Sequence, residues 1–369
     1  MSGHHHLPDE PKRLLPPMRT YAPTDEVDFV IVGSGAAGGV MARELARNGF
    51  SVVVLEQGPW LTERDFSHDQ FWGDVHPEKS LTNRRKDQPG TARKTDKDKT
   101  SPSGWNNYGR VVGGGTVHFT ANYWRFPELE FEQATRFGVP DDSTIADWPI
   151  RYADLEPYYT KVEWDIGVSG LAGNPFEPRR SKGYPVPPLP IKSEGVLLER
   201  GAKKLGMHPW PAPMAILSRP YNGRSGCAAC GICIGNACEV RAKSSTLVTM
   251  IPEAVATGRC EIRTHSYVRK VDTNAAGRVT GVTYFDKDKK EVQQKAKVVV
   301  LCANGCETPK LLLMSATSAF PDGLANSSGQ VGRNIMFNGS ALRAGLFEHE
   351  VNGWKGAVVS RVVWDTWEL

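Results

Sequence analysis

The sequence has no apolar run long enough to span a bilayer, and its N-terminal segment has no hydrophobic stretch typical of a secretion signal. It also has little net charge: 45 Lys and Arg stand against 41 Asp and Glu, giving +4. This balance argues against nucleic acid or a membrane surface as a partner. By its own sequence the chain is expected to be cytoplasmic, with the Pro-rich residues 1–25 as an extended arm.

The sequence has seven cysteines, an odd number, and four of them follow a C-x2-C-x2-C-x4-C pattern. These four are Cys227, Cys230, Cys233 and Cys238. A disulfide framework fits poorly in a chain of this size without a signal, so a metal or cluster site fits better. Three alternatives remain: an iron–sulfur cluster, a structural zinc ion for which the short spacings are cramped, or free buried thiols. The scattered Cys260, Cys302 and Cys306 are interpreted as core residues.

The chain is organised around Val27–Gly58, which predicts a strand–turn–helix–strand unit. An apolar run, Val27–Val32, leads into a glycine-rich turn. A helix-compatible stretch, Ala36–Asn48, precedes a second β-branched run, Ser51–Leu55. This order is typical of a unit that binds a dinucleotide.

Four residues of this unit have defined roles in such a site. Gly33, Gly35 and Gly38 have G-x-G-x-x-G spacing, and Glu56 follows 21 residues after Gly35. The first glycine permits a tight turn, the second lets the backbone approach a pyrophosphate, and the third lets the helix lie close to the strand. The helix N-terminus offers N–H groups to the phosphates, and the carboxylate of Glu56 can accept ribose hydroxyls.

A second glycine-rich stretch, Gly104–Arg125, contains Gly113, Gly114 and Gly115 followed by Thr116. A glycine-rich loop is usually only a loop, but its place after a dinucleotide motif favours contact with a ligand. The polar Asn83–Ser103 is expected to be a solvated, mobile loop.

The remaining pattern predicts a set of helices and strands. Helices are expected over Trp148–Val168, Glu194–Leu205 and Val248–Ala256, and a further helix is expected to begin at Thr308 and Pro309. Short antiparallel strands are expected over Cys260–Thr264, Val268–Asn274, Gly277–Phe285 and Lys289–Gln294, a buried strand over Lys297–Leu301, and a strand starting within Ser340–Phe347.

Together these stretches resemble the glucose–methanol–choline (GMC) family of FAD oxidoreductases. The resemblance is carried by Gly33–Gly58 with its Glu-Gln-Gly ending, by Gly109–Arg125, by Ala303–Ser315 and by Val331–Asn334. It is strongest to the flavoprotein subunits of bacterial membrane-bound gluconate, sugar and polyol dehydrogenases.

The resemblance implies an α/β fold in two parts. The first is a Rossmann-like FAD-binding domain over residues 26–147 and 225–335, with a central parallel sheet and a small antiparallel sheet. The second is an incomplete α+β substrate domain over residues 148–224 and 336–369.

The resemblance also implies which residues hold FAD. These are Gly33, Gly35, Gly38, Glu56, Arg110, Gly114, Thr116 and Asn122, with Val268 beside the adenine. It leaves open whether His118 is linked covalently to the flavin or packs beside it. Related subunits carry a three-iron cluster held by three cysteines, which implies an iron–sulfur role for the four-cysteine segment.

The implied reaction is oxidation of a CH–OH group by hydride transfer to the flavin, with electrons passed through the cluster to a cytochrome-type acceptor. Related subunits are exported with a small partner that has a twin-arginine signal, which would place the protein at the membrane in the periplasm. Two alternatives stay open: a non-catalytic flavin or electron-transfer subunit, and an FAD alcohol oxidase that uses oxygen.

The sequence departs from the family at the catalytic base. The last histidine is His349, in a polar stretch, and no family base motif follows it. The Asp-His pair common after Gly-Arg-Asn appears as Phe337-Asn338. No catalytic base is therefore assigned: either the sequence is a fragment or a separate chain completes the site. The 369 residues alone are expected to bind FAD weakly or not at all and not to turn over.

Overall fold

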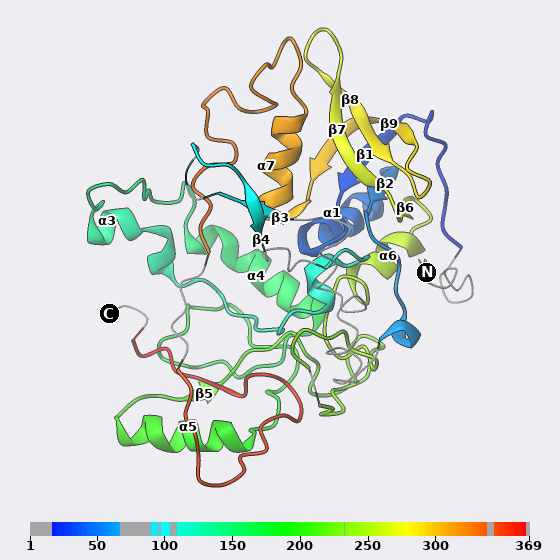
Figure 1. Ribbon diagram of the computed structural model, residues 1–369. Helices are drawn as coiled ribbons and strands as arrows, with labels where there is room; N and C mark the ends of the chain where they lie inside the picture. Colours follow the sequence, from blue (N-terminus) through cyan, green and yellow to red (C-terminus); the bar gives the residue numbers. More distant parts are fainter. Residues whose placement is uncertain are drawn as a thin grey trace, which may run out of the picture. The chain divides into compact units, whose positions relative to one another are not determined.

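The computed structural model describes residues 17–66, 90–93, 95, 97–103, 109–231, 233–337 and 343–366 (Figure 1). The chain divides into two compact units, the first from 1–118 and 245–344 and the second from 119–244 and 345–369. The predicted boundaries differ from this division, because they put 119–147 and 225–244 with the FAD-binding part. Predictions for residues 1–16, most of 67–108, and 338–342 lie outside the described residues.

The first unit contains a six-stranded sheet in the order β6-β2-β1-β9-β8-β7. Its strands are β1 (Val27–Val32), β2 (Val52–Leu55), β6 (Cys260–Arg263), β7 (Tyr267–Thr273), β8 (Val279–Phe285) and β9 (Glu291–Leu301). From β6 to β9 neighbouring strands are parallel, and from β9 to β7 they are antiparallel. The predicted parallel sheet with a smaller antiparallel part is therefore confirmed, as one continuous sheet.

The direction of β6 was predicted wrongly. It is parallel to β2, with Val52 opposite Cys260 and Leu55 opposite Arg263, whereas an antiparallel strand was expected. Residue types and flanking turns indicate that a strand exists, but the partner strand decides its direction.

Strand β9 also differs from the prediction, because two expected strands form one. Its first half is antiparallel to β8, from Glu291 to Lys295, and its second half is parallel to β1, from Ala296 to Leu301. The strand therefore joins the parallel and antiparallel parts. Within the described residues no strand pairs with the edge of its second half that faces away from β1, and Val298 is 43% exposed.

The described residues of the first unit also form three α-helices, α1 (Ala36–Arg47), α6 (Met250–Ala256) and α7 (Asn304–Met314). The start of α7 corrects a second prediction, because the helix begins four residues before Thr308. The Asn304 Oδ1 accepts the N–H groups of Cys306 and Glu307, at 2.8 and 3.0 Å, and so satisfies donors of the first turn. Pro309 consequently lies inside the helix.

The described part of the N-terminal arm is bound to the sheet. Tyr21 is buried, and its N–H donates to the Glu261 carboxylate at 2.8 Å. The Arg263 guanidinium donates to the Tyr21 carbonyl at 2.9 Å. Two short strands, β3 (Gly90–Ala92) and β4 (Ser101–Ser103), pair antiparallel where only a loop was predicted.

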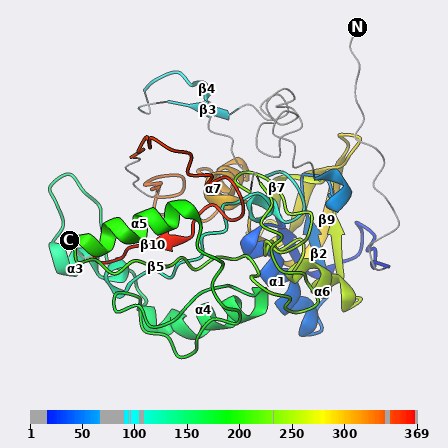
Figure 2. The same ribbon diagram turned by 90° about the horizontal axis from the view of Figure 1, so that it is seen from below.

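The second unit is less regular. Its main helices are α4 (Tyr152–Ile166) and α5 (Ser193–Lys204), and a short strand pair joins β5 (Trp210–Pro211) to β10 (Arg361–Val362). Figure 2 shows α5 beside this pair. The remaining short elements among the described residues are α3 (Gln133–Phe137) and three 3-10 turns, η1 (Glu63–Asp65), η3 (Gly114–Val117) and η4 (Glu128–Phe131). Among described helices, none combines the length and apolarity that crossing a membrane requires.

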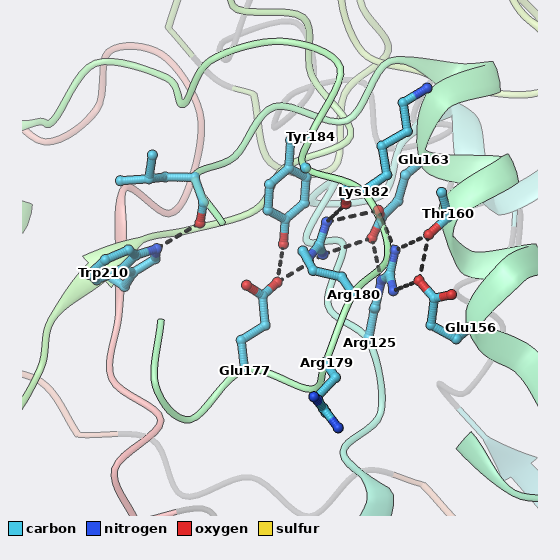
Figure 3. A network of polar contacts seen from close by, with 12 residues as sticks. Arg125, Glu156, Thr160, Glu163, Glu177, Arg179, Arg180, Lys182, Tyr184 and Trp210 are labelled. Atoms are coloured by element: carbon cyan, nitrogen blue, oxygen red, sulfur yellow. Dashed lines mark hydrogen bonds and ion pairs between the residues drawn. The ribbon is translucent and has the colours of Figure 1, made fainter. Parts of the chain in front are cut away.

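A buried ionic network holds α4 to the Pro-rich segment that follows it (Figure 3). Glu163 is fully buried and accepts hydrogen bonds from two guanidinium groups, those of Arg125 at 2.7 and 2.8 Å and of Arg180 at 3.1 and 3.2 Å. Arg180 also pairs with Glu177 at 2.8 Å, and Arg125 with Glu156 at 3.0 Å. Ionic contacts thus fix a segment that forms no regular structure.

Candidate cofactor-binding site

A cavity of about 210 Å³ lies in the first unit, where strands β1 and β2 end. Residues 32–35, 55–57, 266–269 and 302–304 form most of its lining, with Gly109, Gly114 and Gly115 from the second glycine-rich stretch. The N-termini of α1 and α7 both reach it, because Gly35 and Ala303, which precede these helices, line it. Two positive helix ends at one cavity favour an anionic ligand.

The three glycines of the first motif have three different environments. Gly33 has φ +94°, and a Cβ there would lie 2.6 Å from the Cys302 carbonyl oxygen. A Cβ on Gly38 would lie 1.9 Å from the carbonyl oxygen of Gly33, so the helix and turn touch. Gly35 lines the cavity, and nothing lies within 4 Å of the place a Cβ would take. Its backbone is therefore open to a ligand.

Glu56 also lines the cavity, at the end of β2. Its carboxylate is 4% exposed and accepts hydrogen bonds from Ser34 Oγ at 2.6 Å, Ser34 N at 3.1 Å and Gly58 N at 3.0 Å. Burial raises the pKa of the Glu56 carboxyl above its usual value, although these hydrogen bonds oppose the rise. The carboxylate is thus fixed in place beside the cavity.

Ser34 connects the two glycine-rich stretches and was not predicted. Its hydroxyl donates to Glu56 and accepts the N–H of Gly113 at 3.0 Å. A Cβ on Gly114, whose φ is +54°, would lie 2.9 Å from the Cα of Gly35, so the second stretch rests on the first turn. A lone serine between two glycines gives no sequence signal for this role.

Thr116 supports the second stretch rather than lining the cavity. Its hydroxyl donates to the Gly113 carbonyl at 2.5 Å and accepts the N–H of Thr246 at 3.1 Å. The Thr246 hydroxyl in turn donates to the Ser34 carbonyl at 3.1 Å. The two threonines therefore position the backbone that forms the cavity wall.

Of the other predicted cofactor contacts, Val268 is the one that lines the cavity, whereas Arg110, His118 and Asn122 do not. Lys310 on α7, a cation that was not predicted, also lines it. The His118 ring lies behind Gly109, where a Cβ would approach its Nε2 to 3.0 Å. Asn122 falls in the second unit, where it pairs with Met214.

The four predicted cluster ligands also lie in the second unit, and all are free thiols. Burial raises the pKa of the Cys227 and Cys230 thiols, and nearby thiols of the same segment raise both further: Cys233 and Cys238 at Cys227, and the other three cysteines at Cys230. Yet within the described residues no three His, Cys, Asp or Glu side chains form a group able to hold a metal ion. The described residues therefore do not support the iron–sulfur prediction.

The sheet, its glycine turn and the acid at the end of β2 define a dinucleotide-binding α/β protein. Residues 27–338 match the family model described as GMC oxidoreductase. The chain belongs to this family, and the predicted family is thereby confirmed.

Two curated relatives have related activities in their names. The 2-methyl-1,2-propanediol dehydrogenase of Mycolicibacterium austroafricanum is 33% identical over 90% of this chain and 59% of its own length. The fructose dehydrogenase large subunit of Gluconobacter japonicus is 33% identical over 85% of this chain and 58% of its own. The chain thus spans less than two thirds of the length of either relative.

Among solved structures, formate oxidase from Aspergillus oryzae matches with a TM-score of 0.51 at 19% identity, over 80% of this chain and 48% of its own. This likeness concerns the fold. The residues that line the cavity fit FAD, the cofactor of the family. No side chain obstructs the Gly35 backbone, where a pyrophosphate would bind, and the residues preceding two helices line the cavity.

Proposed function

We propose that the protein is an FAD-dependent dehydrogenase that oxidises a CH–OH group of a polyol, sugar or sugar acid. The observation that carries this proposal is the open backbone of Gly35 at the N-terminus of α1, in a cavity that Glu56 also lines. Membership of the GMC family and the alcohol and sugar substrates named for two relatives support the choice of reaction.

The residues of this chain have distinct tasks at the cofactor. The backbone of Gly33–Gly35 and the N–H groups of α1 would hold the pyrophosphate, and the buried carboxylate of Glu56 would accept ribose hydroxyls. Residues 266–269 would flank the adenine, since Val268 lines that wall. FAD, when bound, supplies the hydride acceptor at its flavin N5.

No residue of the described chain is assigned as the base that takes the substrate proton. His349, the last histidine, is exposed, as its polar surroundings predict. The base and the substrate pocket would then be supplied from outside these residues, which agrees with the length that the relatives have beyond the match.

The proposal is tested by anaerobic titration of the FAD-loaded protein with a panel of polyols, sugars and sugar acids. Bleaching of the oxidised flavin band by at least one of these alcohols, and not by the matching carboxylic acids or alkanes, is the expected result. Binding of FAD without bleaching by any alcohol, in a preparation that contains the full reading frame, would overturn it.

The electron acceptor is a separate prediction that rests on the family resemblance. A cytochrome-type acceptor and a small partner with a twin-arginine signal are the proposed partners, and the printed name "large subunit" of one relative supports a partner in that case. Reduction of a cytochrome c by the substrate-loaded protein distinguishes this from the oxidase alternative, which would release peroxide. The iron–sulfur route is not part of the proposal, because no ligand group for it is found among the residues that the structure describes.

The link between His118 and the flavin is tested by acid precipitation of the loaded protein. Flavin that stays with the precipitate indicates a covalent bond, and flavin that is wholly released shows that His118 only packs near the cofactor.

A further inference from the structure

One face of α7 forms a wall of the cavity in the first unit. After Asn304, the residues of α7 that line the cavity have i, i+3, i+4 and i+7 spacing, which places them on one side of the helix: Glu307, Lys310, Leu311 and Met314. Two of these side chains are charged and two are apolar. This cavity face of α7 therefore combines an ion pair with apolar contact surface.

The cavity face of α7 stands beside the start of β7 (Figure 1 and Figure 2). The Val271 N–H donates to Ser315 Oγ at 2.9 Å, which holds the end of the helix to the strand. The Ser266 N–H donates to the Glu56 carbonyl at 2.8 Å, so the lining segment 266–269 begins at the acid that would bind the ribose. Since the ribose of the ADP half of FAD joins the pyrophosphate to the adenine, the base would lie between this segment and the cavity face of α7.

Lys310 is the cation of this face. Its Nζ donates to the Glu307 carboxylate at 2.6 Å. Burial acts to lower the pKa of the Lys310 ammonium, but Glu307 and a hydrogen bond to the Tyr267 side chain outweigh it and raise this pKa above its usual value. An ammonium has three N–H groups, and these two partners among the described residues engage two of them. The side chain is 47% exposed, so the third N–H is open to a ligand in the cavity.

We propose that Lys310 is a binding residue for the adenosine half of FAD, with its ammonium donating to an acceptor nitrogen of the adenine while Leu311 and Met314 pack against the base. This inference rests on the proposed function, which supplies FAD as the ligand. Glu307 fixes the ammonium at the cavity wall before the cofactor arrives, so little side-chain freedom is lost on binding. Lys310 thereby favours the dinucleotide FAD over the mononucleotide FMN, which has no adenosine.

The test is calorimetric titration of FAD-free protein, made from the full reading frame, with ADP as the probe for the adenosine half. FMN and inorganic pyrophosphate are the comparison ligands. We expect Lys310→Met to weaken ADP binding at least about tenfold, because a hydrogen bond from a charged donor is lost, and to change FMN and pyrophosphate binding less than about twofold. Lys297→Met is the matched control, since Lys297 belongs to the same unit, pairs with Asp28 at 2.8 Å and does not line the cavity. It should change none of the three affinities.

A second measurement uses the wild-type protein and does not depend on how a variant folds. Acetylation of lysines by an N-hydroxysuccinimide ester is followed by peptide mass spectrometry, with and without ADP. With ADP at about ten times its Kd, acetylation of Lys310 should slow at least about fivefold relative to Lys297, because a bound base covers the amine. Pyrophosphate at the same multiple of its own Kd should not slow it.

Three results would each overturn the proposal. They are equal ADP affinity in wild type and folded Lys310→Met, an equal loss of pyrophosphate affinity, which would place the lysine at the phosphates, and acetylation of Lys310 that ADP does not slow. Neither measurement contains an alcohol or a reduction of flavin. Failure of this inference is therefore distinguishable from failure of the proposed oxidation, which the alcohol titration tests.

Discussion

Replacement of Gly35 by alanine separates the needs of the fold from those of the cofactor. The backbone of Gly35 is extended, with a negative φ of −64° and ψ of −157°, and a Cβ there would meet no protein atom within 4 Å. Gly35→Ala should therefore fold normally. The added methyl group lies in the cavity, where the pyrophosphate of FAD would approach the chain most closely.

The expected changes in stability and binding differ in size. Alanine loses less conformational entropy on folding than glycine, which raises the free energy of unfolding by about 0.5–1 kcal/mol. It is also a poorer N-cap than glycine, which lowers this free energy by a similar amount. The free energy of unfolding should hence change by less than about 1 kcal/mol. For binding, forcing a methyl group into a close contact costs about 1–3 kcal/mol, which weakens FAD binding about 5- to 150-fold.

The assay is FAD titration followed by quenching of flavin fluorescence, with thermal unfolding of the FAD-free protein measured in parallel. Gly201→Ala is the matched control, since Gly201 lies in α5 of the second unit and also has open space around its Cβ position. It should leave FAD affinity unchanged. Unaltered FAD affinity in Gly35→Ala would refute the assignment of this turn to the pyrophosphate, because the variant leaves the fold intact.

Three further predictions concern contacts described above. Ser34→Ala removes the hydroxyl shared by Glu56 and Gly113, and we expect about 1–3 kcal/mol lower stability together with weaker FAD binding; Ser193→Ala, an exposed serine in the second unit, should change neither in the same unfolding and titration assays. Glu163→Ala removes the fully buried carboxylate that two guanidinium groups share and leaves each with one remaining acidic partner, Glu156 or Glu177; urea unfolding followed by tryptophan fluorescence should show a loss of about 3 kcal/mol. By contrast, Asp165→Ala, which breaks the exposed pair with Lys161, should lose under about 1 kcal/mol, and equal losses would contradict the role of the buried network. Burial acts to raise the pKa of the Glu156 carboxyl, but hydrogen bonds from Ser181, Thr160 and Arg125 outweigh it and lower this pKa from 4.5 to about 2. Because the folded-state pKa is the lower one, its stabilisation is present above about pH 4.5 and is lost as the pH falls towards 2; Glu156→Gln should flatten this part of the stability–pH curve, and a curve of unchanged slope would contradict the assignment.

Local sequence signals were sufficient for much of the cavity. Gly33, Gly35 and Gly38 have roles that depend on the absence of a side chain, and this absence is visible in the sequence. Glu56 and Val268 also line the cavity. Glu56 follows the last residue of β2 and Val268 lies near the start of β7, and both strands have a clear apolar pattern. The family match then confirmed the fold class and the family.

Contacts between distant residues were not visible in the same way. Arg125 and Glu163 are 38 residues apart, and nothing in either local pattern indicates that they meet in a buried pair. The Ser34 hydroxyl accepts the N–H of Gly113, and the Thr246 hydroxyl donates to the Ser34 carbonyl; such backbone partners have no residue type to recognise in a sequence. The early start of α7 depends on the side chain of Asn304, whereas the Thr308-Pro309 pair gave the stronger local signal.

The pairing of β1 with β9 can form only late in the synthesis of the chain. Val27 pairs with Ala296 and Val32 with Leu301, so β1 waits for a partner made about 270 residues later. At roughly 5–20 residues per second this delay is on the order of 15–50 seconds. During that time residues 119–244 leave the ribosome, and the second unit can begin to form while the apolar β1 and β2 still lack their neighbour. An apolar strand edge that lacks its partner for this time is open to association with other chains.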